Sequence, residues 1–281
     1  MFVDIGLFAP FVPSLGYVMG GYTTADTNEI DSFNFTTEVR SDVTAILSVS
    51  RKEAAGVNSS TRGYALGGDQ GSTRKNEIDG LQFSNESAIN PAATLSVARH
   101  ALGGFNSTTK GYACGGDNGT TRVNEIDGLQ FSDESAINPS AILAVARSGI
   151  PSSVNSSIKG YVLGGLDNTT YSSEIDGLQF SDESAVNPSA TLSVARYGAG
   201  GINSSVRGYA GGGNTGAVVA EIDGLQFSDE TAINPAATLS VARSTLVGVN
   251  SEANGYLIGG YITTSASDID GLKFFDESAI N

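Results

Sequence analysis

The chain has 281 residues, of which 36 are glycine and 16% are charged, so it is neither a disordered acidic tail nor a solvated helical bundle. Its formal net charge of −15 repels phosphate backbones and anionic lipid headgroups, and we expect no nucleic-acid partner. Cys114 and His100 are the only cysteine and histidine, which excludes an intrachain disulfide and argues against a metal site or a His/Cys catalytic relay. We therefore expect no metal and no cofactor.

The chain opens with an apolar run at residues 1–13. This run carries Asp4, contains two prolines and lacks a basic start, so it does not match a signal peptide. It is also too short to span a bilayer, and we expect no membrane insertion anywhere in the chain. The run is instead predicted to form the first strand of the first repeat.

Six copies of a repeat follow one another along the chain. The pair Gly-Tyr recurs at steps of 47 to 49 residues, at Tyr17, Tyr64, Tyr112, Tyr161, Tyr209 and Tyr256. The triplet Glu/Asp-Ile-Asp recurs around Ile30, Ile78, Ile126, Ile175, Ile222 and Ile269. A period of about 48 residues is typical of repeat folds in which each copy is one supersecondary unit.

Each repeat is predicted to contain four strands. In the third copy these strands fall at residues 100–105, 110–116, 124–131 and 136–143. Short runs of aromatic and β-branched residues, bounded by Gly, Asn, Asp and Ser, are typical of strands, and no run shows the helical period.

Proline indicates the order of these strands. It recurs in the fourth segment, at Pro91, Pro139, Pro188 and Pro235. Proline cannot donate to a sheet ladder and belongs on an edge strand, so the fourth strand is predicted to be the outer edge. The glycine-rich first strand then lies at the crowded inner edge.

These features predict an all-β fold, a single six-bladed β-propeller with four antiparallel strands in each blade. The sixth copy reaches Asn281 within its fourth strand. The predicted blades cover approximately residues 1–50, 51–98, 99–146, 147–195, 196–242 and 243–281.

Two features resemble kelch repeats: the Gly-Gly that closes the second strand and the arginine that precedes the first, although the usual kelch tryptophan is absent. The runs at residues 58–68, 76–79 and 95–99 more closely resemble divergent kelch-like repeats of bacteriophage tail and virion-appendage proteins. The resemblance covers almost the whole chain. It implies a propeller, and a location on a virion among other tail proteins.

The recurring ions are predicted to be structural. The arginines of the connections are Arg51, Arg99, Arg147, Arg196 and Arg243, and the recurring glutamates are Glu77, Glu125, Glu174 and Glu221. Glu125 and Asp127 alternate and so share one face of a strand, where an arginine could pair with either acid between blades. Equivalent charges in nearly every blade argue against a catalytic site, which is asymmetric. The sequence Glu-Ile-Asp-Gly also lacks the spacing of an EF-hand loop.

The loops between the second and third strands differ from copy to copy, whereas the turns after the third strand are nearly identical. Alternating strand direction places all of these loops on one face, and loops on a rigid scaffold usually carry recognition. The candidate ligand-binding residues on this variable face are Tyr22, Asp26, Asp69, Arg74, Asp117, Arg122, Asp167, Tyr171, Asn214 and Tyr261.

The preferred functional hypothesis is a non-enzymatic virion or tail-appendage propeller. It would attach to a host surface, with a glycan or another receptor as ligand, or serve a structural role on the particle. The alternative is a cellular kelch-type module that binds another protein through the same face. A glycan-processing enzyme is the third hypothesis, and it lacks a recognisable constellation of catalytic residues.

Overall fold

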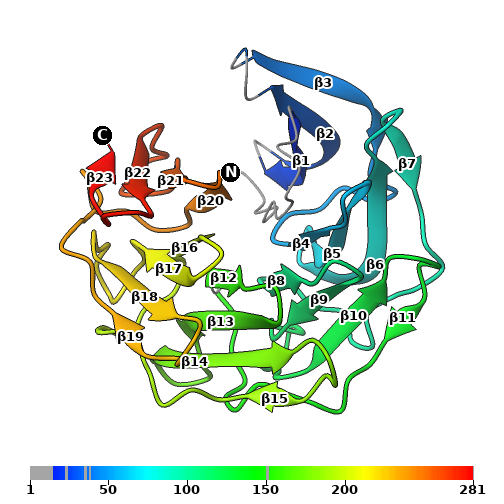
Figure 1. The fold of residues 1–281 in the computed structure, drawn as a ribbon. Helices are drawn as coiled ribbons and strands as arrows, with labels where there is room; N and C mark the ends of the chain where they lie inside the picture. The colour runs from blue at the N-terminus through cyan, green and yellow to red at the C-terminus, as the bar shows by residue number, and fades with distance from the viewer. Residues whose placement is uncertain (1–14, 23–24, 35–36, 38, 150–151, 281) are drawn as a thin grey trace.

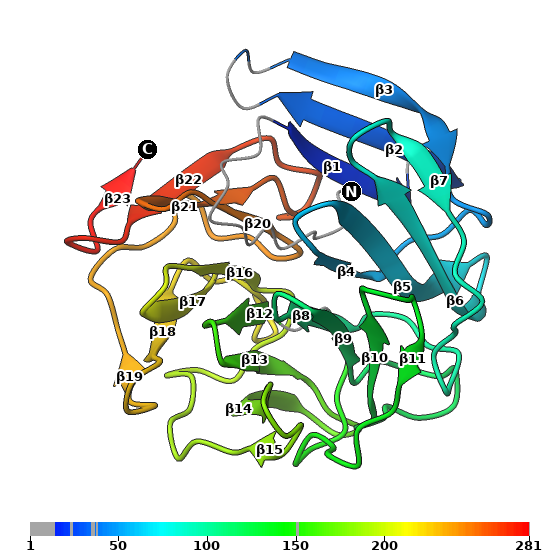
Figure 2. The same cartoon turned by 45° about the vertical axis from the view of Figure 1, so that its right-hand side comes forward.

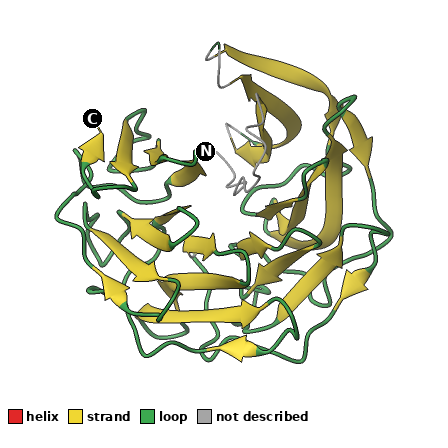
Figure 3. Ribbon diagram, in the orientation of Figure 1, coloured by secondary structure: helices red, strands yellow, loops and turns green. Residues whose placement is uncertain are grey.

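The computed structural model describes residues 15–280, apart from 23–24, 35–36, 38 and 150–151. Throughout these ranges the chain consists of strands and loops (Figure 3), and no helix there is long and apolar enough to cross a membrane. Six sheets follow one another around a common centre (Figures 1 and 2). The chain is a six-bladed β-propeller, as the repeat predicts.

The first three blades contain strands β1 to β11. Blade 1 consists of β1 (Leu15–Tyr22), β2 (Asp26–Asn34) and β3 (Val39–Ile46). Blade 2 consists of β4 (Ala55–Asn58), β5 (Arg62–Gln70), β6 (Thr73–Gln82) and β7 (Ser87–Ile89). Blade 3 consists of β8 (Gly103–Asn106), β9 (Lys110–Cys114), β10 (Ile126–Gln130) and β11 (Ala136–Ile137).

The last three blades contain strands β12 to β23. Blade 4 consists of β12 (Ser152–Asn155), β13 (Lys159–Leu166), β14 (Tyr171–Gln179) and β15 (Ala185–Val186). Blade 5 consists of β16 (Gly200–Asn203), β17 (Arg207–Gly211), β18 (Ile222–Gln226) and β19 (Ala232–Ile233). Blade 6 consists of β20 (Val247–Asn250), β21 (Asn254–Ile258), β22 (Ile269–Lys273) and β23 (Ala279–Ile280).

The strands within each blade pair in sequence order, and every pairing is antiparallel. The first strands β4, β8, β12, β16 and β20 lie around the centre of the ring (Figure 1), where each contacts the next. Blade 1 shows three strands, which correspond to the second, third and fourth strands of the other blades. The apolar run at residues 1–13, predicted to form its first strand, lies outside the described residues.

The fourth strands are shorter than the sequence predicts. β11 ends at Ile137, so Pro139 follows the strand instead of lying within it. The Asn138 amide, oriented to satisfy its neighbours, donates to Asp127 Oδ1 at 3.0 Å and holds this edge on β10 through a side chain. The proline therefore interrupts the outer ladder, because it has no N–H to donate, and pairing resumes at the isolated bridge between Glu125 and Ile142.

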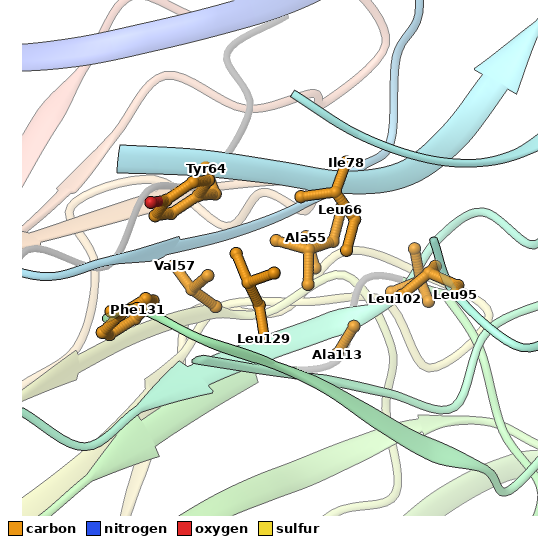
Figure 4. Packing of buried hydrophobic residues seen from close by; sticks show 10 residues of the cluster. All are labelled: Ala55, Val57, Tyr64, Leu66, Ile78, Leu95, Leu102, Ala113, Leu129 and Phe131. Atoms are coloured by element: carbon orange, nitrogen blue, oxygen red, sulfur yellow. The ribbon is translucent and has the colours of Figure 1, made fainter. Parts of the chain in front are cut away.

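The hydrophobic core lies between neighbouring blades. One cluster joins Val57, Tyr64 and Ile78 of blade 2 to Leu129 and Phe131 of blade 3 (Figure 4). The Tyr64 and Phe131 rings stack with centroids 5.7 Å apart and planes 4° apart. Each blade thus completes the core of the blade before it, which explains why one period of sequence builds one period of structure.

Glycines occupy the places where two segments meet most closely. Gly67, the first of the pair that closes the second strand, has a φ of +67°, and a Cβ there would lie 2.7 Å from the Arg99 carbonyl oxygen. Gly80 lies opposite Tyr64 in the sheet, where a Cβ would lie 2.6 Å from the tyrosine ring. The recurring Gly-Gly and Asp-Gly pairs are therefore explained by backbone conformation and close packing.

Candidate functional site

Buried ion pairs join each connection to the blade that follows it. Arg99 is completely buried, and its Nη1 lies 2.6 Å from Asp127 Oδ2. Its Nη2 donates to the Ala113 carbonyl at 3.2 Å. Equivalent pairs are Arg51–Asp79, Arg147–Asp176, Arg196–Asp223 and Arg243–Asp270. These five arginines are structural elements of the fold.

The acid in each pair differs from the candidate glutamates. Glu77, Glu125, Glu174 and Glu221 form no ion pair within the described residues, and the carboxylate two positions later takes that role. The guanidinium of Arg99 binds the carbonyl of Ala113, which is the residue that pairs with Asp127 in the sheet. The arginine therefore lies beside the aspartate, and the glutamate lies two residues earlier in the chain.

Burial, hydrogen bonds and neighbouring charges shift the pKa values of two residues in these pairs. Desolvation lowers the pKa of Arg51, and Asp79 and Glu77 oppose this effect. Desolvation acts in the opposite direction on Asp270, but hydrogen bonds from Ser240 and the pair with Arg243 lower the pKa of this carboxyl overall. The lowered pKa of Asp270 favours the charged form of that carboxyl, as a structural ion pair requires.

A second set of inter-blade contacts was not predicted from the sequence. The Tyr64 hydroxyl donates to Glu134 Oε1 of the next blade at 2.9 Å, and Arg62 Nη1 lies 3.1 Å from the same oxygen. The same tyrosine-to-glutamate bond joins Tyr17 to Glu86, Tyr112 to Glu183, Tyr161 to Glu230 and Tyr209 to Glu277. Each glutamate has a φ of 52° to 57°, a conformation that costs energy outside glycine. The sequence signal that could have predicted this contact is the glutamate that recurs in the turn after the third strand.

The variable loops and the connections form one face of the molecule. Isolated bridges pair Lys52 with Asp69, His100 with Asp117, Ser148 with Leu166, Tyr197 with Asn214 and Ser244 with Tyr261. Each bridge ties the connection that enters a blade to the loop that follows its second strand. Further contacts link these loops from one blade to the next.

Charged residues dominate this variable face on blades 1 to 3. Lys52 Nζ lies 3.3 Å from Asp26 and 4.0 Å from Asp69. Arg74 lies 3.0 Å from Asp69 and 3.8 Å from Asp117 of the next blade. Asp26 also accepts a hydrogen bond from the Gly71 backbone at 2.7 Å. The structure thus places four of the predicted residues in one chain of ions, together with Lys52.

Uncharged groups are more prominent on blades 4 and 5. The Tyr171 ring stacks on Tyr197 with centroids 5.6 Å apart, and both side chains are partly exposed. Asp167 accepts hydrogen bonds from the Thr169 and Thr170 backbone, and Asn214 accepts one from Gly216. Tyr197 was absent from the predicted set, although it stands where other copies have lysine, histidine or serine.

The remaining predicted residues occupy separate places on the face. Arg122 joins blade 3 to blade 4 through Ser148 Oγ, 3.2 Å from its Nε. Tyr22 is 43% exposed and has Lys52 Nζ 4.8 Å from its ring centroid. Tyr261 of blade 6 is 50% exposed. The predicted residues therefore fall mainly into two groups, an ionic one on blades 1 to 3 and one around the Tyr171–Tyr197 stack on blades 4 and 5.

The opposite face carries a shallow, open pocket between blades 2 and 3, lined by Ser59, Thr61, Thr108, Thr109, Gln130, Phe131 and Ser132. Most of these residues belong to turns that recur from blade to blade, so the pocket reflects the repeat. Within the described ranges no cluster of three or more His, Cys, Asp or Glu side chains is arranged to hold a metal ion. Burial raises the pKa of the Cys114 thiol, which does not favour a thiolate nucleophile.

Comparison with models of known protein families and with curated proteins gave no match to this chain. The candidate site therefore rests on its own geometry.

Proposed function

We propose that this chain is a non-enzymatic binding propeller of a virion or tail appendage, and that it attaches to a glycan on a host surface through its variable face. The observation that carries the proposal is the contrast between the contacts that join the blades and the loops of the variable face. The inter-blade contacts are buried and recur from blade to blade, whereas the exposed loops of the variable face differ in every blade. Diversity on a rigid scaffold is typical of recognition surfaces.

The chemistry of the variable face supports a carbohydrate ligand. A tyrosine ring offers an apolar surface to the C–H face of a sugar, and its hydroxyl offers a hydrogen bond. Asn214 forms a backbone bridge with Tyr197, and Asp167 and Asn168 lie in the loop between the paired residues Leu166 and Tyr171. Amide and carboxylate groups of this kind match sugar hydroxyls. The group on blades 4 and 5 is therefore the preferred contact site.

The resemblance to phage appendage repeats supports the virion location, and the net charge of −15 fits a partner other than nucleic acid. Repeated glycan receptors on a cell surface would compensate for weak individual sites through multivalency, because a particle presents several copies of an appendage.

Binding of the purified chain to an array of bacterial surface glycans tests the proposal. The double variant Tyr171→Ala/Tyr197→Ala is expected to lose about tenfold or more in affinity for the bound glycan. Phe275→Ala is the matched control, because Phe275 is an aromatic residue that is 98% exposed in the turn after β22, away from the variable loops. Absence of glycan binding, or equal binding by all three proteins, would contradict the proposal.

A further inference from the structure

Arg122, on the variable face of blade 3, differs from every other arginine of the chain because it has no acidic partner. The other nine arginines lie 2.5 to 3.1 Å from a carboxylate oxygen: Arg40, Arg51, Arg62, Arg74, Arg99, Arg147, Arg196, Arg207 and Arg243. No carboxylate oxygen of the described residues lies within 4.0 Å of Arg122. The chain has 30 acidic residues against 15 basic ones, so an arginine without a carboxylate is unusual here.

Arg74 of blade 2 occupies the equivalent position and shows what Arg122 is missing. Each arginine pairs along the backbone with the residue that follows the glycine pair of its own blade, which is Asp69 in blade 2 and Asp117 in blade 3. Arg74 lies 3.0 Å from Asp69 and 3.8 Å from Asp117 of the next blade. For Arg122 the next blade offers Leu166 at this position, so the second carboxylate is absent.

The acids of the two loops around Arg122 are directed to their own backbones. Asp117 Oδ1 accepts a hydrogen bond at 2.7 Å from the N–H group two residues further on. Asp167 Oδ1 accepts from the N–H groups of Thr169 and Thr170, each at 2.7 Å. These bonds and, to a smaller degree, the positive charge of Arg122 lower the pKa of Asp167. Both carboxylates therefore stabilise loop turns, and neither forms an ion pair with Arg122.

Arg122 is nevertheless held in a fixed position. Its Nε donates to Ser148 Oγ at 3.2 Å, and Ser148 is only 4% exposed. Its backbone N–H donates to Asn168 Oδ1 of the next loop at 3.1 Å. Because Nε is used by Ser148, the edge formed by Nη1 and Nη2 remains, and no described residue accepts a hydrogen bond from it. This edge of a guanidinium matches the two oxygens of a carboxylate.

The two stacked tyrosines lie beside this cation. Gly149 directly follows Ser148, and a Cβ on Gly149 would lie 3.2 Å from the Cβ of Tyr197. Tyr197 therefore packs against the same connection that holds Arg122, and Tyr171 stacks on its ring. The cation and the two rings come from blades 3, 4 and 5, which follow one another around the ring (Figure 1).

We propose that this cluster binds an acidic sugar, with the sugar carboxylate on the Nη edge of Arg122 and the C–H face of the sugar against the Tyr171–Tyr197 stack. The inference rests on the proposed glycan-binding function and specifies its ligand class, which is an oligosaccharide that contains a uronic acid or another carboxylate-bearing sugar. The net charge of −15 favours isolated acidic sugars over a densely charged polyanion, because the chain as a whole repels negative charge.

The test is an array on which each oligosaccharide with a uronic acid stands beside its carboxyl-reduced form, in which the neutral hexose replaces the acid. We expect the full chain to bind the acidic form about tenfold or more tightly, because a charge-assisted, bidentate contact is stronger than a neutral hydrogen bond. This preference should decrease as the salt concentration rises, since ions screen an attraction at a partly exposed site.

Variants of the protein locate the contact. Arg122→Gln is expected to bind the two forms equally, and its retained binding of the reduced form shows that the variant is folded. Arg122→Lys should restore part of the preference, because an ammonium keeps the charge without the planar fork. Arg74→Gln is the matched control on the same face, and it should keep the full preference because Arg74 is already engaged by Asp69. Tyr171→Ala/Tyr197→Ala should weaken binding of both forms.

The outcomes separate this inference from the function on which it rests. Equal binding of acidic and reduced glycans by the native chain, or a preference that persists in Arg122→Gln, would overturn the acidic ligand and leave the proposed function in place. Absence of binding to every glycan on the array would contradict the proposed function, and the acidic ligand with it.

Discussion

The molecule uses arginine and aspartate in two different settings. Between blades, Arg99 and Asp127 are 0% and 4% exposed, and the same pair recurs at each of the five connections. On the variable face, Arg74 and Asp69 pair at 3.0 Å, but the Arg74 side chain is 22% exposed. Blade 3 carries Asp117 and Arg122 at the equivalent positions, yet no other blade forms this ion pair within the described residues. The N–O distances in the two kinds of ion pair are therefore similar, but only the partly exposed pair is free to change from blade to blade.

The difference in burial explains this contrast. A buried guanidinium that loses its carboxylate has no water to replace it, so every connection needs both partners. A partly exposed ion pair contributes little to stability and its residues can be exchanged. For these ion pairs, recurrence within the chain accompanies burial and variation accompanies partial exposure.

The largest effect is expected from Asp127→Ala, which leaves Arg99 buried without a counterion. We expect a loss of about 3–5 kcal/mol in the free energy of unfolding, measured by urea denaturation. Asp31→Ala is the control at the same position of blade 1, where the pair is exposed, and it should cost about 0–1 kcal/mol. Equal losses in the two variants would show that burial does not distinguish the pairs.

The fold could be predicted because its determinants repeat in the sequence. The Gly-Tyr, Gly-Gly and Glu-Ile-Asp spacings define the blades, and the structure has one sheet for each copy. The exact ends of the fourth strand could not be predicted. They depend on Asn138, whose amide binds Asp127 in place of a backbone ladder.

The partners of the recurring side chains were harder to predict. Glu125 and Asp127 share one face of a strand, so alternation alone does not show which acid meets the arginine. The bond from Tyr64 to Glu134 joins residues 70 positions apart in different blades, and only the packing distance between blades brings them together. On the variable face, the Tyr171–Tyr197 stack likewise joins two loops that no sequence period relates.

Two glycines allow a second comparison between a recurring position and a position in a variable loop. Gly67 recurs in every blade and Gly71 does not, yet both have positive φ values, of +67° and +54°. Gly67→Ala adds a Cβ 2.7 Å from the Arg99 carbonyl, whereas a Cβ at Gly71 meets nothing within 4 Å. We expect Gly67→Ala to cost about 2–4 kcal/mol and Gly71→Ala about 1 kcal/mol in thermal unfolding. A larger cost at Gly71 would contradict this assignment.

The tyrosines of the frame predict sensitivity to alkali. Burial, together with the hydrogen bond to Glu134, raises the pKa of Tyr64 from 10.0 to about 12, and Arg62 opposes this shift. Burial and Glu86 raise the pKa of Tyr17 to about 12 as well. The raised pKa stabilises the fold fully below pH 10, and this contribution is lost as the pH rises through the folded value.

We therefore expect the free energy of unfolding to decrease steeply between pH 10 and 12. Tyr64→Phe should lower stability by about 0.5–1.5 kcal/mol at neutral pH through the lost hydrogen bond, and should make the alkaline decrease less steep. Denaturation series at several pH values, followed by tyrosinate absorbance, measure both effects. An unchanged slope in the variant would separate Tyr64 from the alkaline transition.

The smallest effect on stability is expected on the variable face itself. Arg74→Ala removes a partly exposed partner of Asp69, and Lys52 remains 4.0 Å from that carboxylate, so the free energy of unfolding should change by about 0–1 kcal/mol. Its matched counterpart, Arg99→Ala, removes the same side chain from a buried pair and should cost several times more. Urea denaturation of the two variants compares the loss of the same side chain from a partly exposed ion pair and from a buried one. If Arg74→Ala were as destabilising as Arg99→Ala, the variable loops would be needed for the stability of the fold. Their diversity would then no longer indicate a surface that is free to bind a ligand.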